Sequence, residues 1–151
     1  MKKTYRQSIF KMAFASTLIA CAFNVSAQVK VGVIEGLSGP PAIVDFGESY
    51  LQGIKLALKD YQAAGGKTKI ELTVYDDEAN PQRAVTLAQR LIQNDKASVI
   101  IGTVSSGNVL AIAPILQKAG IPLVAGPSIA TNITTQFIEE NPSQIFRCSM
   151  V

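Results

Sequence analysis

The 151-residue chain carries 14 Lys and Arg against 11 Asp and Glu, two cysteines and no histidine. Without histidine it cannot build a Ser-His-Asp or Cys-His nucleophile or a histidine-ligated metal site, which excludes much of hydrolase chemistry. Four of the basic residues and none of the acidic ones lie in residues 1–27, so the remainder has ten basic against eleven acidic residues. A net charge of −1 there gives no support for a nucleic acid or an anionic membrane as partner.

Residues 1–27 have the pattern of a secretory signal peptide. Basic residues precede an apolar run over residues 12–23, and Val25-Ser26-Ala27 supplies the small residues that a signal peptidase reads. The run is too short to span a bilayer. We therefore expect an exported chain from residue 28 onward. An alternative stays open, because Leu18-Ile19-Ala20-Cys21 resembles the lipobox of a lipoprotein, which would leave the chain anchored through a lipidated Cys21.

Cleavage after Ala27 would leave Cys148 as the single cysteine of the exported chain. We therefore predict no intramolecular disulfide. We interpret Cys148 as an apolar residue at the end of a strand, with a reactive thiol as the alternative.

The exported part begins with an apolar run over residues 29–34 that predicts a first strand. Residues 35–47, rich in Gly and Pro, predict a long polar loop. Such loops often bind ligands, so Phe46 is either a ligand-facing aromatic or a helix-packing one. A helix ending at Gly65-Gly66 is expected next. Its buried stripe at helical spacing consists of Leu51, Ile54, Leu58 and Tyr61.

A second strand, in which Ile70, Leu72 and Val74 alternate, ends at the acidic cluster Asp76-Asp77-Glu78. Consecutive acids in a loop usually form a solvated rim. A divalent-cation site and a phosphoryl-accepting aspartate are alternatives, and export argues against the latter. Pro81 is well placed for the first turn of the next helix. The apolar face of that helix consists of Ala84, Leu87, Ala88, Leu91 and Ile92.

Residues 99–101 are a continuous β-branched run, as expected for a parallel strand covered on both faces. The polar residues 105–108 that follow would cap a helix and leave backbone N–H groups free for an anion. Val109, Ile112, Ala113 and Leu116 recur at helical spacing and form the expected apolar stripe of this helix. Pro114 is expected to kink this helix or split off its first turn, and Gly120 to end it. Two more strands are predicted, at residues 122–125 and 145–147, with a polar loop over residues 126–132 between them.

This alternation predicts an α/β domain with a parallel sheet and helices on both faces. The polar loops after residues 101 and 125 follow two strands at their carboxyl ends, where open parallel sheets bind ligands. Helix capping and turn formation would equally explain the serines and glycines of these loops. GTVSSG, at residues 102–107, lacks the Lys-Ser/Thr ending of a phosphate-binding loop, so nucleotide binding is not expected.

An ordered set of stretches resembles the amino-terminal lobe of periplasmic solute-binding proteins of the branched-chain amino-acid, leucine-binding type, ABC transporter family. The stretches are VKVGVIEGLSGPPA, GIKLALKDYQAAGG, YDDEANPQRAVTLAQRLI and VIIGTVSSGNVLAIAPILQKAGIPLVAGPS. The resemblance spans residues 29–148 and rests on the whole set at the expected spacings. It implies a type I periplasmic-binding-protein lobe that binds an amino acid or similar small carboxylate between two lobes for delivery to a membrane permease. It implies no enzymatic activity, no cofactor and no metal.

The resemblance also implies ligand-binding roles for individual residues. Ser106 matches a serine whose hydroxyl and N–H hold the ligand carboxylate. Ser128 and Ala130 lie in the segment whose backbone carbonyl accepts from the ligand ammonium, and Thr131 matches a threonine that contacts both charged groups. Phe46 lies near the aromatic of the family's first loop. Fixed dipoles suit this task because a zwitterion taken out of water needs hydrogen bonds at both ends.

The chain departs from the family pattern in several places. The first loop and the loop over residues 126–131 look longer than in leucine-binding members, with Ile129 inserted, so side-chain specificity does not carry over. Ala79 and Ser105 stand where some members have cysteines that form a disulfide.

The chain stops at Val151, about where the first hinge should cross into the second lobe. We therefore expect residues 28–151 to be an amino-terminal lobe whose second lobe is missing. A ligand-sensing domain of a receptor or regulator is the alternative function, and an α/β enzyme is suggested only by the loop serines.

Overall fold

The computed structural model describes residues 28–149, so the predicted signal peptide and the lipid anchor at Cys21 lie outside the described residues. Residues 28–149 form a five-stranded parallel sheet in the order β2-β1-β3-β4-β5, as the alternating pattern predicts. The strands are β1 (Gln28–Glu35), β2 (Lys69–Asp76), β3 (Val99–Gly102), β4 (Leu123–Ala125) and β5 (Ile145–Arg147). The helices are α1 (Pro41–Ala63), α2 (Pro81–Arg90), the π-helical turn η1 (Leu91–Asp95), α3 (Ser106–Ala119) and α4 (Asn132–Thr135).

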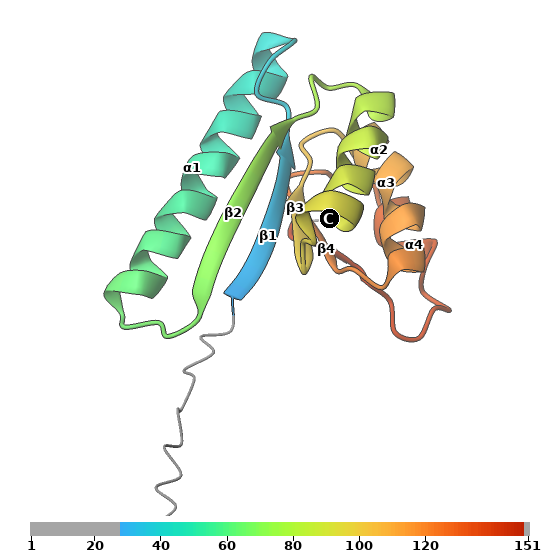
Figure 1. Ribbon diagram of the computed structural model, residues 1–151. Helices are drawn as coiled ribbons and strands as arrows, with labels where there is room; N and C mark the ends of the chain where they lie inside the picture. Colours follow the sequence, from blue (N-terminus) through green and yellow to red (C-terminus); the bar gives the residue numbers. More distant parts are fainter. Residues whose placement is uncertain (1–27, 150–151) are drawn as a thin grey trace, which may run out of the picture.

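Helices α2, α3 and α4 cover one face of the sheet, on the right in Figure 1. The side chains between these helices and the sheet form the main core, and the largest of them are fully buried. They are Ile34, Leu91, Ile100, Ile112, Leu116 and Leu123. The Asn80 side chain caps α2 by accepting from the Arg83 N–H at 3.0 Å. The apolar periodicity of α2 and of α3 therefore predicts the buried faces of these two helices correctly.

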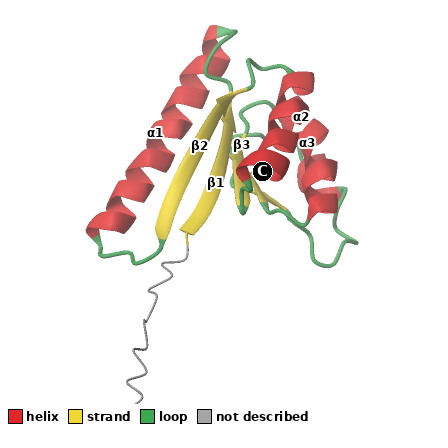
Figure 2. Cartoon of the chain, viewed as in Figure 1, coloured by secondary structure: helices red, strands yellow, loops and turns green. Residues whose placement is uncertain are grey.

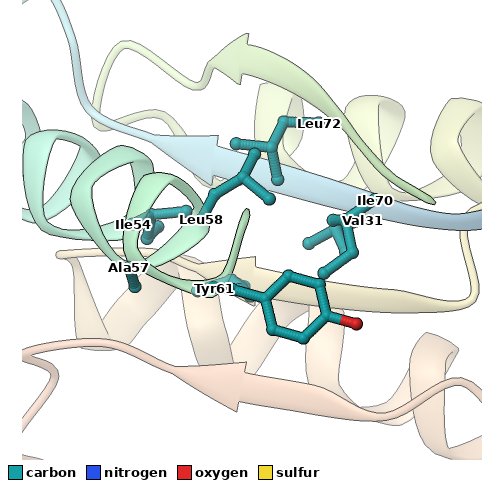
Figure 3. A pocket seen from close by; sticks show the side chains of 8 residues that line it. Val31, Ile54, Ala57, Leu58, Tyr61, Ile70 and Leu72 are labelled. Atoms are coloured by element: carbon teal, nitrogen blue, oxygen red, sulfur yellow. The ribbon is translucent and has the colours of Figure 1, made fainter. Parts of the chain in front are cut away.

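The opposite face of the sheet is covered by α1 alone among the described elements, and the helix stands beside β1 and β2 (Figures 1 and 2). Of the predicted stripe, Leu51 is buried, Ile54 and Leu58 are half-buried and Tyr61 is exposed. An open apolar cavity of about 310 Å³ lies between the helix and the sheet (Figure 3). Its lining consists of Val31, Ile54, Ala57, Leu58, Tyr61, Ile70, Leu72 and Ile101. The stripe faces the sheet as predicted, but its side chains do not pack tightly against the strands.

The predicted loop over residues 35–47 is wrong in extent, because α1 begins at Pro41 and Phe46 lies on the helix. Pro40 takes the extended conformation of an N-cap and Pro41 occupies the first turn, where a missing N–H costs nothing. Gly47 does not break the helix. A Cβ there would lie 2.3 Å from the Gly36 carbonyl oxygen, so this glycine allows α1 to approach the loop after β1.

Helix α3 runs through Pro114 without being split, which corrects the expectation that its first turn would separate. Because proline has no N–H, the helix lacks one backbone hydrogen bond at Pro114. The ring is exposed and does not pack against a neighbouring element. Gly120 ends the helix as predicted, with φ +66. The short helix α4 was not predicted. Within residues 28–149 no helix combines the length and the apolarity that crossing a membrane requires.

Candidate functional site

The loop between β3 and α3 supplies the polar part of the candidate site. Ser105 precedes α3 in extended conformation and makes no side-chain capping bond within the described chain. The first backbone bond of the helix runs from the Val109 N–H to the Ser105 carbonyl at 3.0 Å. The amides of residues 106–108 therefore precede the bonded ladder and carry the positive end of the helix dipole. Helix N-termini of this kind can bind anions, so the anion site expected here stays a prediction.

Phe46 and Ser106 line the same cavity, which has a volume of about 320 Å³. Its walls come from the first turns of α1, from the loop after β3 and from the loop after β4. The other lining residues are Ala42, Ile43, Val104, Pro127 and Ile129. Phe46 is 60% exposed and Ile129 is 72% exposed, so two large apolar side chains flank the opening. The cavity thus offers apolar walls with one hydroxyl at the helix N-terminus.

The other three predicted residues lie in the loop after β4 but do not line this cavity. The Ser128 side chain is 1% exposed, and its Oγ donates to the Thr103 carbonyl at 2.6 Å. The Ala130 N–H donates to Ser106 Oγ at 3.4 Å, which places the two loops in contact. Thr131 is exposed at the start of α4, where its carbonyl accepts from the Thr134 N–H at 3.3 Å. A ligand contact at these residues remains a prediction.

A buried polar cluster beneath these loops was missed by the sequence analysis. Asp77 is fully buried, and its Oδ2 accepts from Thr103 Oγ1 at 2.7 Å and from Asn108 Nδ2 at 2.8 Å. Its Oδ1 accepts from the Ala79 N–H at 2.9 Å. The interpretation of the acidic cluster as a solvated rim is therefore wrong for Asp77, because its partners lie in a loop and a helix that follow much later in the sequence.

Glu35 ends β1 beside this cluster and is fully buried. Neither carboxyl oxygen has a hydrogen-bond partner within residues 28–149, and the same holds for Asn108 Oδ1. Burial, and next the negative charge of Asp77, raise the pKa of the Glu35 carboxyl to about 8, and the Val104 N–H, which approaches the carboxyl without forming a regular hydrogen bond, opposes this only weakly. At neutral pH the Glu35 carboxyl is therefore mostly protonated, which spares the interior a second unpaired charge.

The remaining acids of the cluster serve local structure. Asp76 accepts from the Leu37 N–H at 2.9 Å and from the Ser38 hydroxyl at 2.6 Å, which holds the loop after β1. These bonds lower the pKa of Asp76 against the opposing effect of its partial burial. Glu78 pairs with Arg83 at 3.3 Å, with both side chains about half exposed. No group of three or more potential ligands among residues 28–149 could hold a metal ion.

One signal in the sequence could have revealed the cluster. Asn108, Ile112 and Leu116 recur at a spacing of four, and all three are fully buried. A polar residue on the buried stripe of a helix must find a partner inside the fold. An acid at the end of a neighbouring strand can supply this partner, and Asp77 is such a residue.

The segment after β5 closes this end of the sheet. Ser149 Oγ donates to the Ser128 carbonyl at 2.6 Å, and Arg147 Nη1 donates to the Ile129 carbonyl at 2.7 Å. Cys148 is a free, exposed cysteine whose N–H donates to the Ala125 carbonyl at 3.1 Å. Cys148 therefore lies at the end of a strand as predicted, but it is exposed and not part of the apolar core.

Comparison with known proteins covers nearly all of the described residues. A family model described as "Periplasmic binding protein" matches residues 28–147. An "Amino acid binding protein" of Pseudomonas aeruginosa is 32% identical over 150 residues, which are 97% of this chain and 38% of that protein.

Two solved structures have the same fold over most of the described chain. The substrate-binding protein of a branched-chain amino acid transporter from Streptococcus pneumoniae, in complex with isoleucine, has a TM-score of 0.67 at 25% identity, over 72% of this chain and 31% of that one. A solute-binding protein of an ABC transporter from Rhodopseudomonas palustris, in complex with 3,4-dihydroxybenzoic acid, has a TM-score of 0.65 at 33% identity, over 72% and 30%.

The chain spans about a third of the length of these relatives. The family is one of solute-binding proteins, which confirms the prediction of a binding protein rather than an enzyme. The parallel sheet, the strand-end loops and the match over residues 28–147 together place this chain in the periplasmic binding protein family, as its resemblance to the leucine-binding type predicts.

Proposed function

We propose that residues 28–151 form the amino-terminal lobe of a binding protein that takes up a small carboxylate with an apolar body. One observation carries this proposal: Phe46 and Ser106, from elements 60 residues apart in the sequence, line one cavity at the free N-terminus of α3. The Ser106 hydroxyl and the first amides of α3 would hold the carboxylate. Phe46, Ile43 and Ile129 would contact the apolar body of the ligand.

The ligands of the two structural relatives support this class of molecule. Isoleucine and 3,4-dihydroxybenzoic acid both join a carboxylate to an apolar body, although only isoleucine also carries an ammonium group. Ser128, Ala130 and Thr131 line the same strand end, and the carbonyls of their loop would accept from an ammonium group. The proposal therefore includes amino acids and simple aromatic carboxylates.

In the full-length protein, a second lobe would close over this cavity and exclude water. We propose that the protein acts in the periplasm and delivers its ligand to the membrane permease of an ABC transporter. The predicted export signal at residues 1–27 supports this location, with the lipid anchor at Cys21 as the alternative. A ligand-sensing domain would use the same cavity and differ in what it contacts next.

Isothermal titration calorimetry of the full-length protein with isoleucine and with 3,4-dihydroxybenzoic acid tests the proposal. We expect at least one of the two to bind, and Ser106→Ala to weaken that binding by about 1 to 3 kcal/mol through loss of a charge-assisted hydrogen bond. Ser105→Ala is the matched control, because this neighbouring serine does not line the cavity and should leave the affinity unchanged. Equal affinities of the wild type and Ser106→Ala would contradict the role of Ser106.

A further inference from the structure

A chain of hydrogen bonds crosses the carboxyl ends of the strands beneath the candidate site. Asp77 after β2 accepts from Thr103 after β3 and from Asn108 on α3. The Thr103 carbonyl accepts from Ser128 Oγ after β4, and the Ser128 carbonyl accepts from Ser149 Oγ after β5. We call Asp77, Thr103, Asn108 and Ser128 the strand-end relay.

The relay is inaccessible to a ligand. Asp77, Thr103 and Asn108 are fully buried, and Ser128 is 1% exposed. None of them lines the cavity that contains Phe46 and Ser106. The four side chains therefore act on the site through the backbone that they fix. Hydrogen bonds to a carboxylate are stronger than neutral ones, and burial from water increases the difference.

The backbone that the relay fixes is the backbone of the site. Ser106 lies between Thr103 and Asn108, so Asp77 restrains the serine loop on both sides of Ser106. Ser128 lies between Pro127 and Ile129, which both line the cavity. Its bond to the Thr103 carbonyl transmits the restraint from the first loop to the second.

From this arrangement we propose that Asp77 is a positioning residue for ligand binding. One buried carboxylate holds both loops in register, and with them the Ser106 hydroxyl and the amides of α3, without touching the ligand. This inference rests on the proposed function for the site that it positions.

An amide side chain at position 77 could not accept all of the hydrogen bonds that Asp77 accepts. Asp77 uses both oxygens as acceptors: Oδ1 takes the Ala79 N–H, and Oδ2 takes the Thr103 hydroxyl and the Asn108 amide. Asparagine has one acceptor oxygen, so Asp77→Asn must present its own NH₂ group to one of these donors. Exchanging the partners as well, in Asp77→Asn/Asn108→Asp, restores a donor and an acceptor between positions 77 and 108.

Hydrogen–deuterium exchange and calorimetry on the full-length protein test the inference. Asp77→Asn should speed exchange of the amides at residues 103–108 and 128–130 by about tenfold or more, since local opening costs less without the buried bonds. The same variant should weaken binding of isoleucine or 3,4-dihydroxybenzoic acid, by at most about the hundredfold that corresponds to losing a hydrogen bond to a charged group. The reciprocal double variant should recover the part of both losses that comes from the bond between positions 77 and 108.

Asp76→Asn is the matched control, because this neighbouring acid bonds the loop after β1 and not the relay. It should leave exchange at residues 103–108 and 128–130 unchanged. If Asp77→Asn fails to fold, Thr103→Val removes one donor of the relay at equal size, and it should speed exchange in the same two segments. Unchanged exchange in both loops of a folded Asp77→Asn or Thr103→Val variant would overturn the inference.

The two readouts separate this inference from the proposed function. If the wild type binds neither compound while Asp77→Asn still loosens both loops, the relay stands and the proposed ligand class fails. If the wild type binds and Asp77→Asn binds equally well with unchanged exchange, the function stands and the positioning role is wrong. Failure of the reciprocal variant to recover protection would also overturn the assignment of the role to the bond between positions 77 and 108.

Discussion

Both faces of the sheet carry apolar side chains, but they differ in how closely helices pack on them. On the face of α2, α3 and α4, side chains such as Ile100, Ile112 and Leu116 are fully buried. On the face of α1, Leu58 and Ile101 are half-buried beside an open cavity of about 310 Å³. Apolar periodicity therefore predicts which side of a helix faces the sheet. How deeply its side chains are buried depends on the elements that pack around them.

The candidate site joins these two faces. Its polar half, with Ser106, lies on α3 and is supported by the tightly packed face and by the strand-end relay. Its apolar half includes Phe46 on α1, next to Gly47, where the helix lies close to the loop after β1.

The largest loss of stability should come from Leu116→Ala, on the closely packed face of the sheet. Leu116 is fully buried between α3 and the sheet, so truncation leaves a cavity that close packing cannot fill. We expect the free energy of unfolding to fall by about 2 to 5 kcal/mol, measured by urea denaturation. A loss below that of Leu58→Ala, the same substitution on the open face, would contradict the comparison.

Glu35 tests whether water reaches the α1 face of the sheet at the carboxyl end of β1. Its side chain lies on the same face of β1 as those of Val31 and Val33. Its pKa rises from 4.5 to about 8 on folding, so the folded chain holds this proton more tightly than the unfolded chain. The stability from the neutral carboxyl is complete below pH 4.5 and is lost as the pH rises to about 8.

The variant Glu35→Gln stays neutral throughout this range. Its free energy of unfolding should therefore exceed that of the wild type progressively from pH 4.5 to about 8, by roughly 4 kcal/mol at the upper end. Urea denaturation at a series of pH values measures the difference, and titrations common to both proteins cancel in it. A difference in free energy of unfolding that stays constant across this pH range would show that water reaches the Glu35 carboxyl in the folded protein.

The smallest effect is expected for Leu58→Ala in α1. Leu58 is half-buried and lines the open cavity, so much of its surface is already in contact with solvent. We expect a loss below about 1.5 kcal/mol, since only the area removed from water contributes. A loss equal to that of Leu116→Ala would mean that this face is covered as completely as the other one.

The strands and long helices were predictable because their signal is local. The runs at β1, β3 and β4 and the stripes of α2 and α3 follow from periodicity alone. The start of α1 was not predicted, because Gly and Pro over residues 36–41 read as a loop, and Gly47 serves close packing rather than chain reversal. Pro114 likewise lies within a continuous helix.

Pairing of the site residues was only partly predictable. The position of Ser106 at a strand end follows from the order of elements, and its proximity to Phe46 follows from the family resemblance. The relay required knowledge of contacts across 26 to 31 residues, since Asp77 looks like any loop acid until Thr103 and Asn108 are placed beside it. Burial of Glu35 is equally nonlocal, because β1 lies between β2 and β3, which follow it much later in the sequence.

A structure of the full-length protein with bound isoleucine or 3,4-dihydroxybenzoic acid tests the central claim most directly. The account predicts a ligand carboxylate within hydrogen-bonding distance of Ser106 Oγ and the first amides of α3, with the apolar body against Phe46 and Ile129. A carboxylate bound away from the α3 N-terminus, or a ligand in the apolar cavity between α1 and the sheet, would contradict it.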